Sequence, residues 1–444
     1  MAKRYLIETF GCQMNFHDSE RMAGLLESAG YEPAESPADA DVIVLNTCTV
    51  REKAEDKVYS RIGELRHDAE SQGRQPVLAV TGCLAQQEGA VIFRKSPFVD
   101  VIIGTQAEKR LPMLVAEAGA TGHRQIDINP YDDVSFPLGV IQRADPVKAY
   151  VTIIEGCNDF CAFCVVPYTR GHERMRPKAD ILAEVAGAAA GGRREVQLLG
   201  QIVNHYQAPD DPACDFAGLL AAVDAVPGVD RIRFASPHPR HVTPRLVEAM
   251  AELPHVCNHI HLPVQSGATR LLAAMRRRHT REEYLELVEQ LKARVPGIQL
   301  STDIIVGFPG ETEADFAGTL SLAEAVGFHS MFSFKYSERP NTLAARRLAD
   351  DVPEAEKTRR LTILQTRQAE IQQALHQRTV GQSVEVLVDS ISRRRETELS
   401  GRTTGNTVVN FPGDPGLLGA LVSVRVERAG AHSLWGRLVQ DGPA

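Results

Sequence analysis

The sequence lacks a long apolar run: none reaches the ~18 residues that a membrane-spanning helix needs. The chain passes from Met1 straight into a strand pattern, without the apolar region of a signal peptide. We therefore expect a cytoplasmic protein with no membrane partner, in which the eight cysteines stay reduced. A large excess of positive charge is also absent. The net charge of −8 argues against a uniformly basic nucleic-acid binder, although it does not exclude a local basic patch.

The chain has no internal repeat of the kind that builds solenoids, and it has no low-complexity tract. What is present is ordinary globular composition. With 444 residues, 43% of them hydrophobic and 24% charged, the chain predicts two or three domains with sizeable cores.

Three of the cysteines stand close together after an apolar strand pattern, in the stretch Cys157-Asn158-Asp159-Phe160-Cys161-Ala162-Phe163-Cys164. They cannot complete a tetrahedral zinc site without a fourth ligand, and the next fifteen residues offer only His172. An iron–sulfur cube held by three thiolates fits this spacing better, because its fourth iron stays open for a small molecule. The alternatives are a zinc site completed from elsewhere and three unligated core cysteines.

Three further cysteines follow strands near the start of the chain. Strands alternate there with amphipathic helices, which is typical of a parallel sheet with right-handed crossovers. The expected strands are Tyr5–Thr9, Val42–Asn46, Pro76–Val80 and Val99–Ile103, with helices near Ser19–Ala29, Lys53–Glu70 and Leu84–Lys95. Cys12, Cys48 and Cys83 stand just beyond the first three strands, at the carboxyl edge where open α/β sheets bind ligands. We expect them to meet and to hold a second cluster; three buried structural cysteines are the alternative. Gly11 and Gly82 permit a tight turn or a close approach.

From Tyr150 onward, six strand and helix units predict a partial (β/α)6 barrel. The expected strands are Tyr150–Glu155, Glu195–Leu199, Arg231–Ala235, His259–Val264, Gln299–Val306 and His329–Tyr336. The cysteine loop follows the first strand, on the carboxyl-terminal face where barrel enzymes place their chemistry. The turn from Gly307 to Glu311 lies on that face and fits a nucleoside site, or a plain strand-to-helix turn. His261 and Gln265, at the fourth strand, are further candidate ligands.

The last part of the chain predicts a small β-barrel, because five short strands separated by turns follow between Ser383 and Val439. A long charged amphipathic helix, Pro353 to Arg378, leads into it. Two arginine runs, Arg276–Arg278 and Arg393–Arg395, are equally compatible with solvated loops and with RNA contacts. We expect four segments: an α/β domain over 1–120, a linker over 121–142, the partial barrel over 143–376 and the small barrel over 377–444.

The cysteine loop and the strand before it resemble the signature of the radical S-adenosylmethionine enzymes. Together with the N-terminal three-cysteine domain and a C-terminal barrel that resembles the TRAM domain, nearly the whole chain resembles the methylthiotransferases. Three motifs are similar to the branch that acts on tRNA isopentenyladenosine: Glu8–Asn15, Val166–Gly171 and Leu199–Asn204. Members of the threonylcarbamoyl-adenosine branch tend to have lysine-valine where Gln13-Met14 stand. Two motifs depart from the family pattern, at Met175, where serine is usual, and at Gly200-Gln201.

The resemblance implies that Cys157, Cys161 and Cys164 hold a radical-generating [4Fe–4S] cluster. It implies that Cys12, Cys48 and Cys83 hold an auxiliary [4Fe–4S] cluster that supplies or carries sulfur. The residues expected to contact S-adenosylmethionine are Gly307, Glu311 and Gln265. One S-adenosylmethionine would methylate a cluster-bound sulfur, and a second would yield the radical that takes hydrogen from C2 of N6-isopentenyladenosine at tRNA position 37.

The implied partners are the tRNA anticodon stem-loop that carries isopentenyladenosine and an electron donor such as flavodoxin or ferredoxin. We expect the protein to be a monomer. The nearest alternative is the same chemistry on threonylcarbamoyl-adenosine or on a ribosomal protein, and a non-catalytic iron–sulfur carrier is an alternative of another class. The barrel and its glycine turn disfavour a carrier, which needs no nucleoside pocket.

Overall fold

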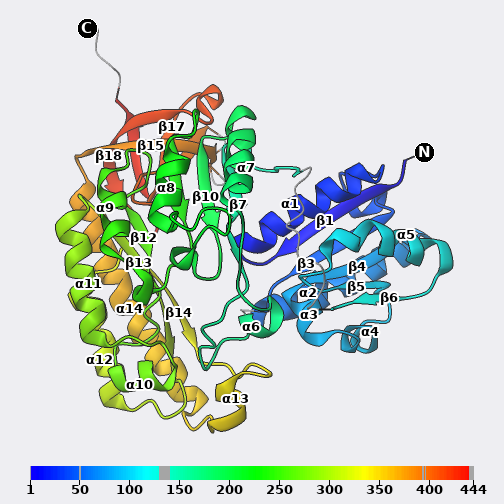
Figure 1. Ribbon diagram of the computed structural model, residues 1–444, viewed down its shortest axis with the longest axis horizontal. Coiled ribbons are helices and arrows are strands. Elements are labelled where there is room, and N and C mark those ends of the chain that lie inside the picture. Colours follow the sequence, from blue (N-terminus) through cyan, green and yellow to red (C-terminus); the bar gives the residue numbers. More distant parts are fainter. Residues whose placement is uncertain (1, 50–51, 130–140, 393–394, 396, 440–444) are drawn as a thin grey trace. The chain divides into compact units, whose positions relative to one another are not determined.

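The computed structural model describes residues 2–49, 52–129, 141–392, 395 and 397–439 (Figure 1). The chain divides into two compact units: 1–144 with 155–160 and 164–176, and 145–154 with 161–163 and 177–444. Half of the linker predicted for 121–142, including Pro130, Tyr131, Asp132 and Asp133, lies outside the described residues. Among the helices within these ranges, none is both long enough and apolar enough to cross a membrane.

The first unit is built on a six-stranded parallel sheet in the order β2-β1-β3-β4-β5-β6. Its strands are β1 (Arg4–Phe10), β2 (Glu32–Pro33), β3 (Val42–Thr47), β4 (Val77–Gly82), β5 (Val101–Ile103) and β6 (Gln125–Asp127). The four predicted strands are present. The two edge strands β2 and β6 were not expected, because two or three residues are too few to show a period.

Helices cover both faces of this sheet (Figure 1). They are α1 (Gln13–Ser28), α2 (Glu52–Ser71), α3 (Cys83–Glu88), α4 (Val91–Lys95) and α5 (Leu111–Thr121). Val42 and Val44 pack with residues of α1 and α5, whereas Ile43 and Leu45 pack with residues of α2 and α3, as the two-residue period of a strand requires. The single helix predicted for Leu84–Lys95 is wrong. It is interrupted at Gly89, which has a φ of +52° and lies outside the helical region.

The second unit contains six parallel strands that form the partial barrel. They are β7 (Lys148–Thr152), β10 (Glu195–Leu199), β11 (Arg231–Phe234), β12 (His259–His261), β13 (Gln299–Val306) and β14 (Ser330–Lys335). They pair as β11-β10-β7 and β12-β13-β14, and a parallel bridge between Ile232 and Val256 joins the two groups. The strands run parallel with helices between them, so the expected partial barrel is confirmed.

The remaining short elements and the barrel's helices complete the region before the small barrel (Figure 1). They are β8 (Ile154–Glu155), α6 (Val166–Thr169), β9 (Arg174–Met175), α7 (Lys178–Ala190), α8 (Phe216–Asp224), α9 (Pro244–Glu252), α10 (Thr269–Ala274), α11 (Arg281–Arg294), α12 (Glu313–Val326), α13 (Leu343–Arg347) and α14 (Glu354–Thr379). The amino end of α11 is fixed by a capping box in which Thr280 and Glu283 exchange hydrogen bonds.

The C-terminal strands close into a five-stranded barrel in the order β15-β16-β17-β19-β18, which confirms the small barrel. Its strands are β15 (Ser383–Ile391), β16 (Glu398–Arg402), β17 (Val408–Pro412), β18 (Leu421–Ala429) and β19 (Leu434–Leu438). Val386, Val409 and Phe411 are among its fully buried core residues. Closure leaves no free strand edge, so this module needs no covering helix.

Two buried arginines of β11 attach the small barrel to the partial barrel. Arg233 donates hydrogen bonds to the carbonyls of Thr403 and Thr404, at 2.6 and 3.0 Å, and its Nε binds Glu195 at 2.8 Å. Arg231 donates to the carbonyl of Arg402 at 2.5 Å. Because these arginines lie at the start of β11, the β16–β17 turn closes the amino-terminal end of the barrel strands.

Candidate cluster and nucleoside sites

Cys12, Cys48 and Cys83 come together at the carboxyl edge of the first unit's sheet. Cys12 stands two residues after β1, and Cys48 and Cys83 directly follow β3 and β4. The Cys12 and Cys48 thiols are hydrogen-bonded, and the Arg170 guanidinium interacts with both Cys12 and Cys83. Cys48 and Cys83 are buried, whereas Cys12 is exposed. The thiols therefore share one end of the sheet, although they are far apart in the sequence.

The surroundings of Cys12 favour its thiolate form, whereas those of Cys83 act in both directions. Hydrogen bonding with Cys48 lowers the pKa of Cys12 to about 6, assisted by the charge of Arg170 and by backbone N–H groups of Asn15 and Met14 at the start of α1. Burial raises the pKa of Cys83, and the charge of Arg170 opposes this rise. Because the thiolate is the metal-binding form of cysteine, Arg170 supports ligand chemistry at this edge.

The glycines before two of these cysteines are required by close packing. Gly82 has a φ of +87°, and a Cβ there would stand 2.5 Å from Asn46 Oδ1 and from the carbonyl of Thr47. A Cβ at Gly11 would stand 2.3 Å from Asn15 Oδ1. The Asn15 amide in turn donates to Asn46 Oδ1 at 3.1 Å. The glycines thus let the strand ends and the α1 start approach one another.

The segments that flank the second cysteine loop also belong to the first unit. Glu155 precedes the loop and binds Arg21 and Arg174, each at 3.0 Å. Arg170 follows the loop and binds Asp18 of α1 at 2.7 Å, with both side chains buried. A buried ion pair tolerates the loss of neither partner, so both flanks of the loop are held firmly to α1.

The loop itself is divided between the two units, with Cys157 and Cys164 in the first and Cys161 in the second. Within the first unit, the Cys157 amide donates to the carbonyl of Gly171 at 3.1 Å. Within the second, Arg277 Nη1 lies 3.6 Å from Cys161 Sγ. Arg277 is buried, so it is neither a solvated side chain nor an RNA contact, unlike both expectations for the run Arg276–Arg278.

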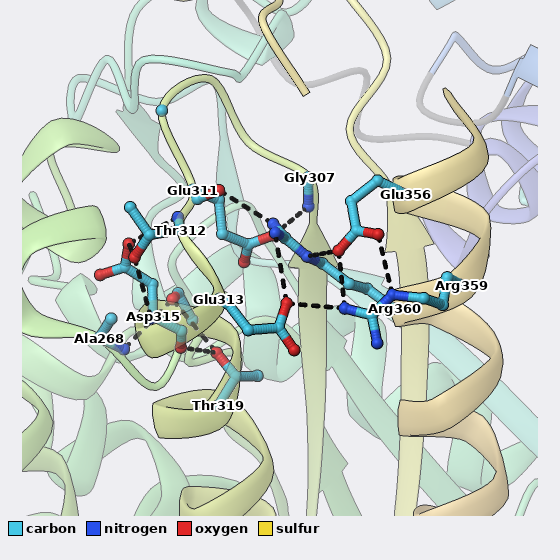
Figure 2. A network of polar contacts seen from close by, with 12 residues as sticks. Ala268, Gly307, Glu311, Thr312, Glu313, Asp315, Thr319, Glu356, Arg359 and Arg360 are labelled. Atoms are coloured by element: carbon cyan, nitrogen blue, oxygen red, sulfur yellow. Dashed lines mark hydrogen bonds and ion pairs between the residues drawn. The ribbon is translucent and has the colours of Figure 1, made fainter. Parts of the chain in front are cut away.

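The turn after β13 is fixed by a network that includes α14 (Figure 2). The buried Glu311 carboxylate accepts hydrogen bonds from the Gly307 amide at 2.5 Å and from Arg360 Nη1 at 2.8 Å. Burial raises the pKa of Glu311, and these two hydrogen bonds oppose the rise. Gln265 is buried just beyond β12, and its φ of +75° lets its backbone bridge to β13. Glu311 therefore holds the turn in place.

The small barrel carries an aromatic residue with arginines around it. Arg428 stacks over the Trp435 ring with its guanidinium carbon 4.0 Å from the centroid, and Arg437 lies 5.9 Å away. Trp435 Nε1 donates to Glu398 at 3.0 Å, and Arg395 binds the same carboxylate at 2.9 Å. Arg393 and Arg394, the other members of that run, lie outside the described residues.

Comparison with known proteins covers the whole chain. Residues 4–104 match an uncharacterized protein family, UPF0004, residues 151–323 match the radical SAM superfamily and residues 377–439 match the TRAM domain. The chain is 46% identical over 450 residues to a tRNA-2-methylthio-N(6)-dimethylallyladenosine synthase of Nitrosospira multiformis, covering 100% of this chain and 94% of the relative. It is 48% identical to a protein of the same name from Pseudomonas paraeruginosa, with 99% of each covered.

The chain belongs to the tRNA-2-methylthio-N(6)-dimethylallyladenosine synthase family. Among solved structures, the radical S-adenosylmethionine methyltransferase TsrM from Kitasatospora setae aligns with a TM-score of 0.58 at 15% identity, over 78% of this chain and 74% of that one. The radical enzyme OxsB aligns with a TM-score of 0.53 at 12% identity, over 83% and 56%. At such low identities these two structures support only the fold of this synthase-family chain.

Three arginines of this synthase-family chain that contact the site were not expected from the sequence. Arg170 stands within the motif Val166–Gly171, but nothing local indicates that it reaches Cys12. Arg277 lies in an arginine run whose burial only tertiary structure reveals. Arg360 is one of many charged residues on α14, and the sequence does not show that it alone lies opposite a buried glutamate.

Proposed function

We propose that this chain is a radical S-adenosylmethionine enzyme that methylthiolates C2 of N6-isopentenyladenosine at position 37 of tRNA. The observation that carries the proposal is the meeting of Cys12, Cys48 and Cys83 at one sheet edge beside Arg170. A radical enzyme that only cleaves S-adenosylmethionine has no need of that second thiol set. The family to which the chain belongs bears the name of this reaction.

The donor chemistry suits two [4Fe–4S] clusters. In the part of the chain that the structure describes, no group of three or more His, Cys, Asp and Glu side chains is arranged to hold a single metal ion. The thiolates of a cluster bind different irons, so three thiols can share an edge without surrounding one ion. Cys12, Cys48 and Cys83 would hold the auxiliary cluster, and Cys157, Cys161 and Cys164 the radical-generating one. When bound, the clusters and S-adenosylmethionine supply the radical, the methyl group and the sulfur.

The chain's own residues orient these groups and exclude water. Gly307 and Gln265 would contact S-adenosylmethionine at the carboxyl-terminal face of the barrel. Glu311 lies in the same turn and accepts a hydrogen bond from the Gly307 amide. Arg360 neutralises the charge of the Glu311 carboxylate. Arg277 donates toward Cys161 Sγ, and hydrogen bonds to cluster sulfurs tune reduction potential.

The small barrel would supply tRNA affinity rather than chemistry. Its described surface places Arg428, Arg437 and Arg395 around Trp435, which offers guanidinium groups to phosphates and an aromatic face to a base. Changing Arg428 and Arg437 to alanine should weaken tRNA binding and flatten its salt dependence by about one unit of slope for each phosphate that the protein then fails to neutralise. Unaltered affinity across a salt series would contradict this assignment. The same measurement applies to the run Arg393–Arg395.

The wider assignments follow from the same proposal. The segments 1–120, 121–142, 143–376 and 377–444 would be the auxiliary-cluster domain, linker, radical domain and tRNA-binding domain. The partner would be the anticodon stem-loop, the electron donor a flavodoxin or ferredoxin, the protein a monomer and its compartment the cytoplasm. Methylthiolation of threonylcarbamoyl-adenosine or of a ribosomal protein is not favoured, because the relatives over the full length carry the dimethylallyladenosine name.

Cysteine variants test the division of labour. Cys161→Ala should stop reductive cleavage of S-adenosylmethionine to 5′-deoxyadenosine, whereas Cys48→Ala should spare the cleavage and abolish methylthio transfer. Anaerobically reconstituted wild type should hold about eight irons, and each variant about four. Cys214→Ala is the matched control, because Cys214 is a buried cysteine outside both triplets and its loss should change neither readout. Full iron and full transfer in Cys48→Ala would refute the auxiliary assignment.

Nucleoside analysis tests the substrate. In tRNA from a strain without this protein, the 2-methylthio group should disappear from isopentenyladenosine and from no other nucleoside. An unchanged nucleoside profile would sink the proposed function.

A further inference from the structure

One face of the sheet β12-β13-β14 carries side chains that none of the preceding roles uses. Leu300, Thr302 and Ile304 are completely or almost completely buried on the other face. Ser301, Asp303 and Phe332 share the unused face, since Ser301 pairs with Ser330 and Asp303 pairs with Phe332 in the parallel register. His261 joins them, because it pairs with Ser301. We call these four residues the inner face.

Phe332 is an unusual residue for the middle of a barrel strand, because its side chain is 51% exposed. Its ring meets that of His261 edge-on, with centroids 5.9 Å apart and an interplanar angle of 70°. One flat face of an aromatic ring that is half open to solvent is a platform on which a planar base can stack. The exposed ring lies beside the polar side chains of His261 and Asp303, so this face offers one ligand both an apolar surface and hydrogen-bonding groups.

A directional chain of hydrogen bonds ends at Asp303. Ser301 Oγ lies 3.0 Å from His259 Nε2 and 2.9 Å from His261 Nδ1. His261 Nε2 lies 3.3 Å from Asp303 Oδ2. If His261 Nε2 donates to the carboxylate, its Nδ1 must accept from Ser301, whose oxygen then accepts from His259. His261 is one donor to the Asp303 carboxylate, whose side chain is 29% exposed and so retains acceptor capacity.

From this arrangement we propose that the inner face is the seat of the N6-dimethylallyladenine base, with Phe332 as the specificity-determining residue. The inference rests on the proposed function and deepens it. In that base one nitrogen carries both an N–H donor and an apolar dimethylallyl chain. Asp303 and Phe332 are register partners on adjacent strands about 4.8 Å apart, so an acceptor stands directly beside an apolar ring. The pair matches the donor and the apolar chain on one atom.

The place of the seat in the fold agrees with its chemistry. Asp303 stands three residues before the end of β13 at Val306, and Gly307 follows that end, so the seat lies just inside the carboxyl-terminal end of β13. Bases in an anticodon loop can be splayed out of their stack and read by aromatic and polar side chains. A substituent that carried a carboxylate on N6 would meet the Asp303 carboxylate instead, and like charges repel.

The test measures binding by the full-length holoenzyme. The probes are two anticodon stem-loop RNAs that differ only at position 37, with N6-dimethylallyladenosine or with adenosine. Phe332→Ala should raise the Kd for the modified RNA about 5- to 150-fold, the range that corresponds to the ~1–3 kcal/mol of stacking on one aromatic side chain. It should also reduce the preference for the modified RNA. Phe332→Leu keeps an apolar contact and should recover part of that preference.

The matched control is Ile363→Ala. It removes a partly exposed apolar side chain that lies on α14, away from the inner face, and it should leave both Kd values unchanged. Unchanged binding of S-adenosylmethionine by Phe332→Ala supports the seat, whereas an equal loss would mean that this face holds the adenine of the cofactor and would overturn the proposal. An unchanged preference in Phe332→Ala would also overturn it. Failure of the wild type to methylthiolate tRNA would count against the proposed function itself, so the two failures are distinguishable.

Discussion

Replacing Arg360 with methionine should destabilise the second unit strongly, because it leaves the buried carboxylate of Glu311 without its cation. The Glu311 side chain is completely buried and that of Arg360 is 6% exposed. Removal of one partner from such a pair costs about 3–5 kcal/mol. At ~2–4 °C per kcal/mol for a domain of this size class, the apparent melting temperature should fall by about 6–20 °C.

The neighbouring arginine provides the comparison. Arg359 binds Glu313 and Glu356, but its side chain is 45% exposed, so Arg359→Met should lower the melting temperature far less than Arg360→Met. Melting scans at one fixed rate compare the two variants, and equal shifts would refute the argument from burial. The pH dependence has a definite sign. Burial already raises the pKa of Glu311, and loss of Arg360 should raise it further, so the deficit of Arg360→Met should shrink as the pH falls and the carboxyl takes up a proton.

Three further predictions concern other parts of the chain. The variant Gly82→Ala should lose the auxiliary iron and melt at a lower temperature, because the added Cβ would clash with backbone atoms. Gly30 has the same φ of +87° but stands in open space, so Gly30→Ala should cost only backbone strain. Iron content and melting temperature separate the two variants. Thr280→Ala should lower the free energy of unfolding by about 1 kcal/mol in melting experiments, because it removes the α11 cap. Thr280→Ser keeps a capping hydroxyl and should retain most of that stability. Arg277→Met should lower the reduction potential of the cluster proposed at Cys161 by tens of mV in an electron paramagnetic resonance titration, on the order expected when a donor to sulfur is removed; an unchanged potential would contradict that contact.

Much of the architecture could be predicted because apolar residues recur at the short spacings typical of helices and strands. Strands such as β3 and β13 have the apolar pattern and length of buried strands, and parallel strands end at one edge, so their order along the chain is enough to bring Cys12, Cys48 and Cys83 together. The break at Gly89 could not be predicted with the same ease, because a single glycine within a helical pattern often stays helical.

The functional environment was less predictable for a physical reason. Arg170 and Asp18 are 152 positions apart, and only the packed fold brings their charges together. The exposure of Phe332 runs against the usual burial of phenylalanine in strands, so the sequence pattern indicates its face of the sheet but not whether anything covers that face.

The β16–β17 turn changes what the small barrel can do for RNA. Because Arg233 of the partial barrel donates hydrogen bonds to the carbonyls of Thr403 and Thr404, this module is anchored in the partial barrel and is not held by a flexible linker alone. A tethered module would present its cargo at an effective concentration set by linker length, and the target base would have to search for its site. An anchored module keeps a fixed position relative to the partial barrel. Under the proposed function, the distance from an RNA stem bound by the small barrel to the inner face would be set when the polypeptide folds. A chain truncated before the small barrel would lose that fixed distance, and the buried Arg233 guanidinium would lose its carbonyl acceptors.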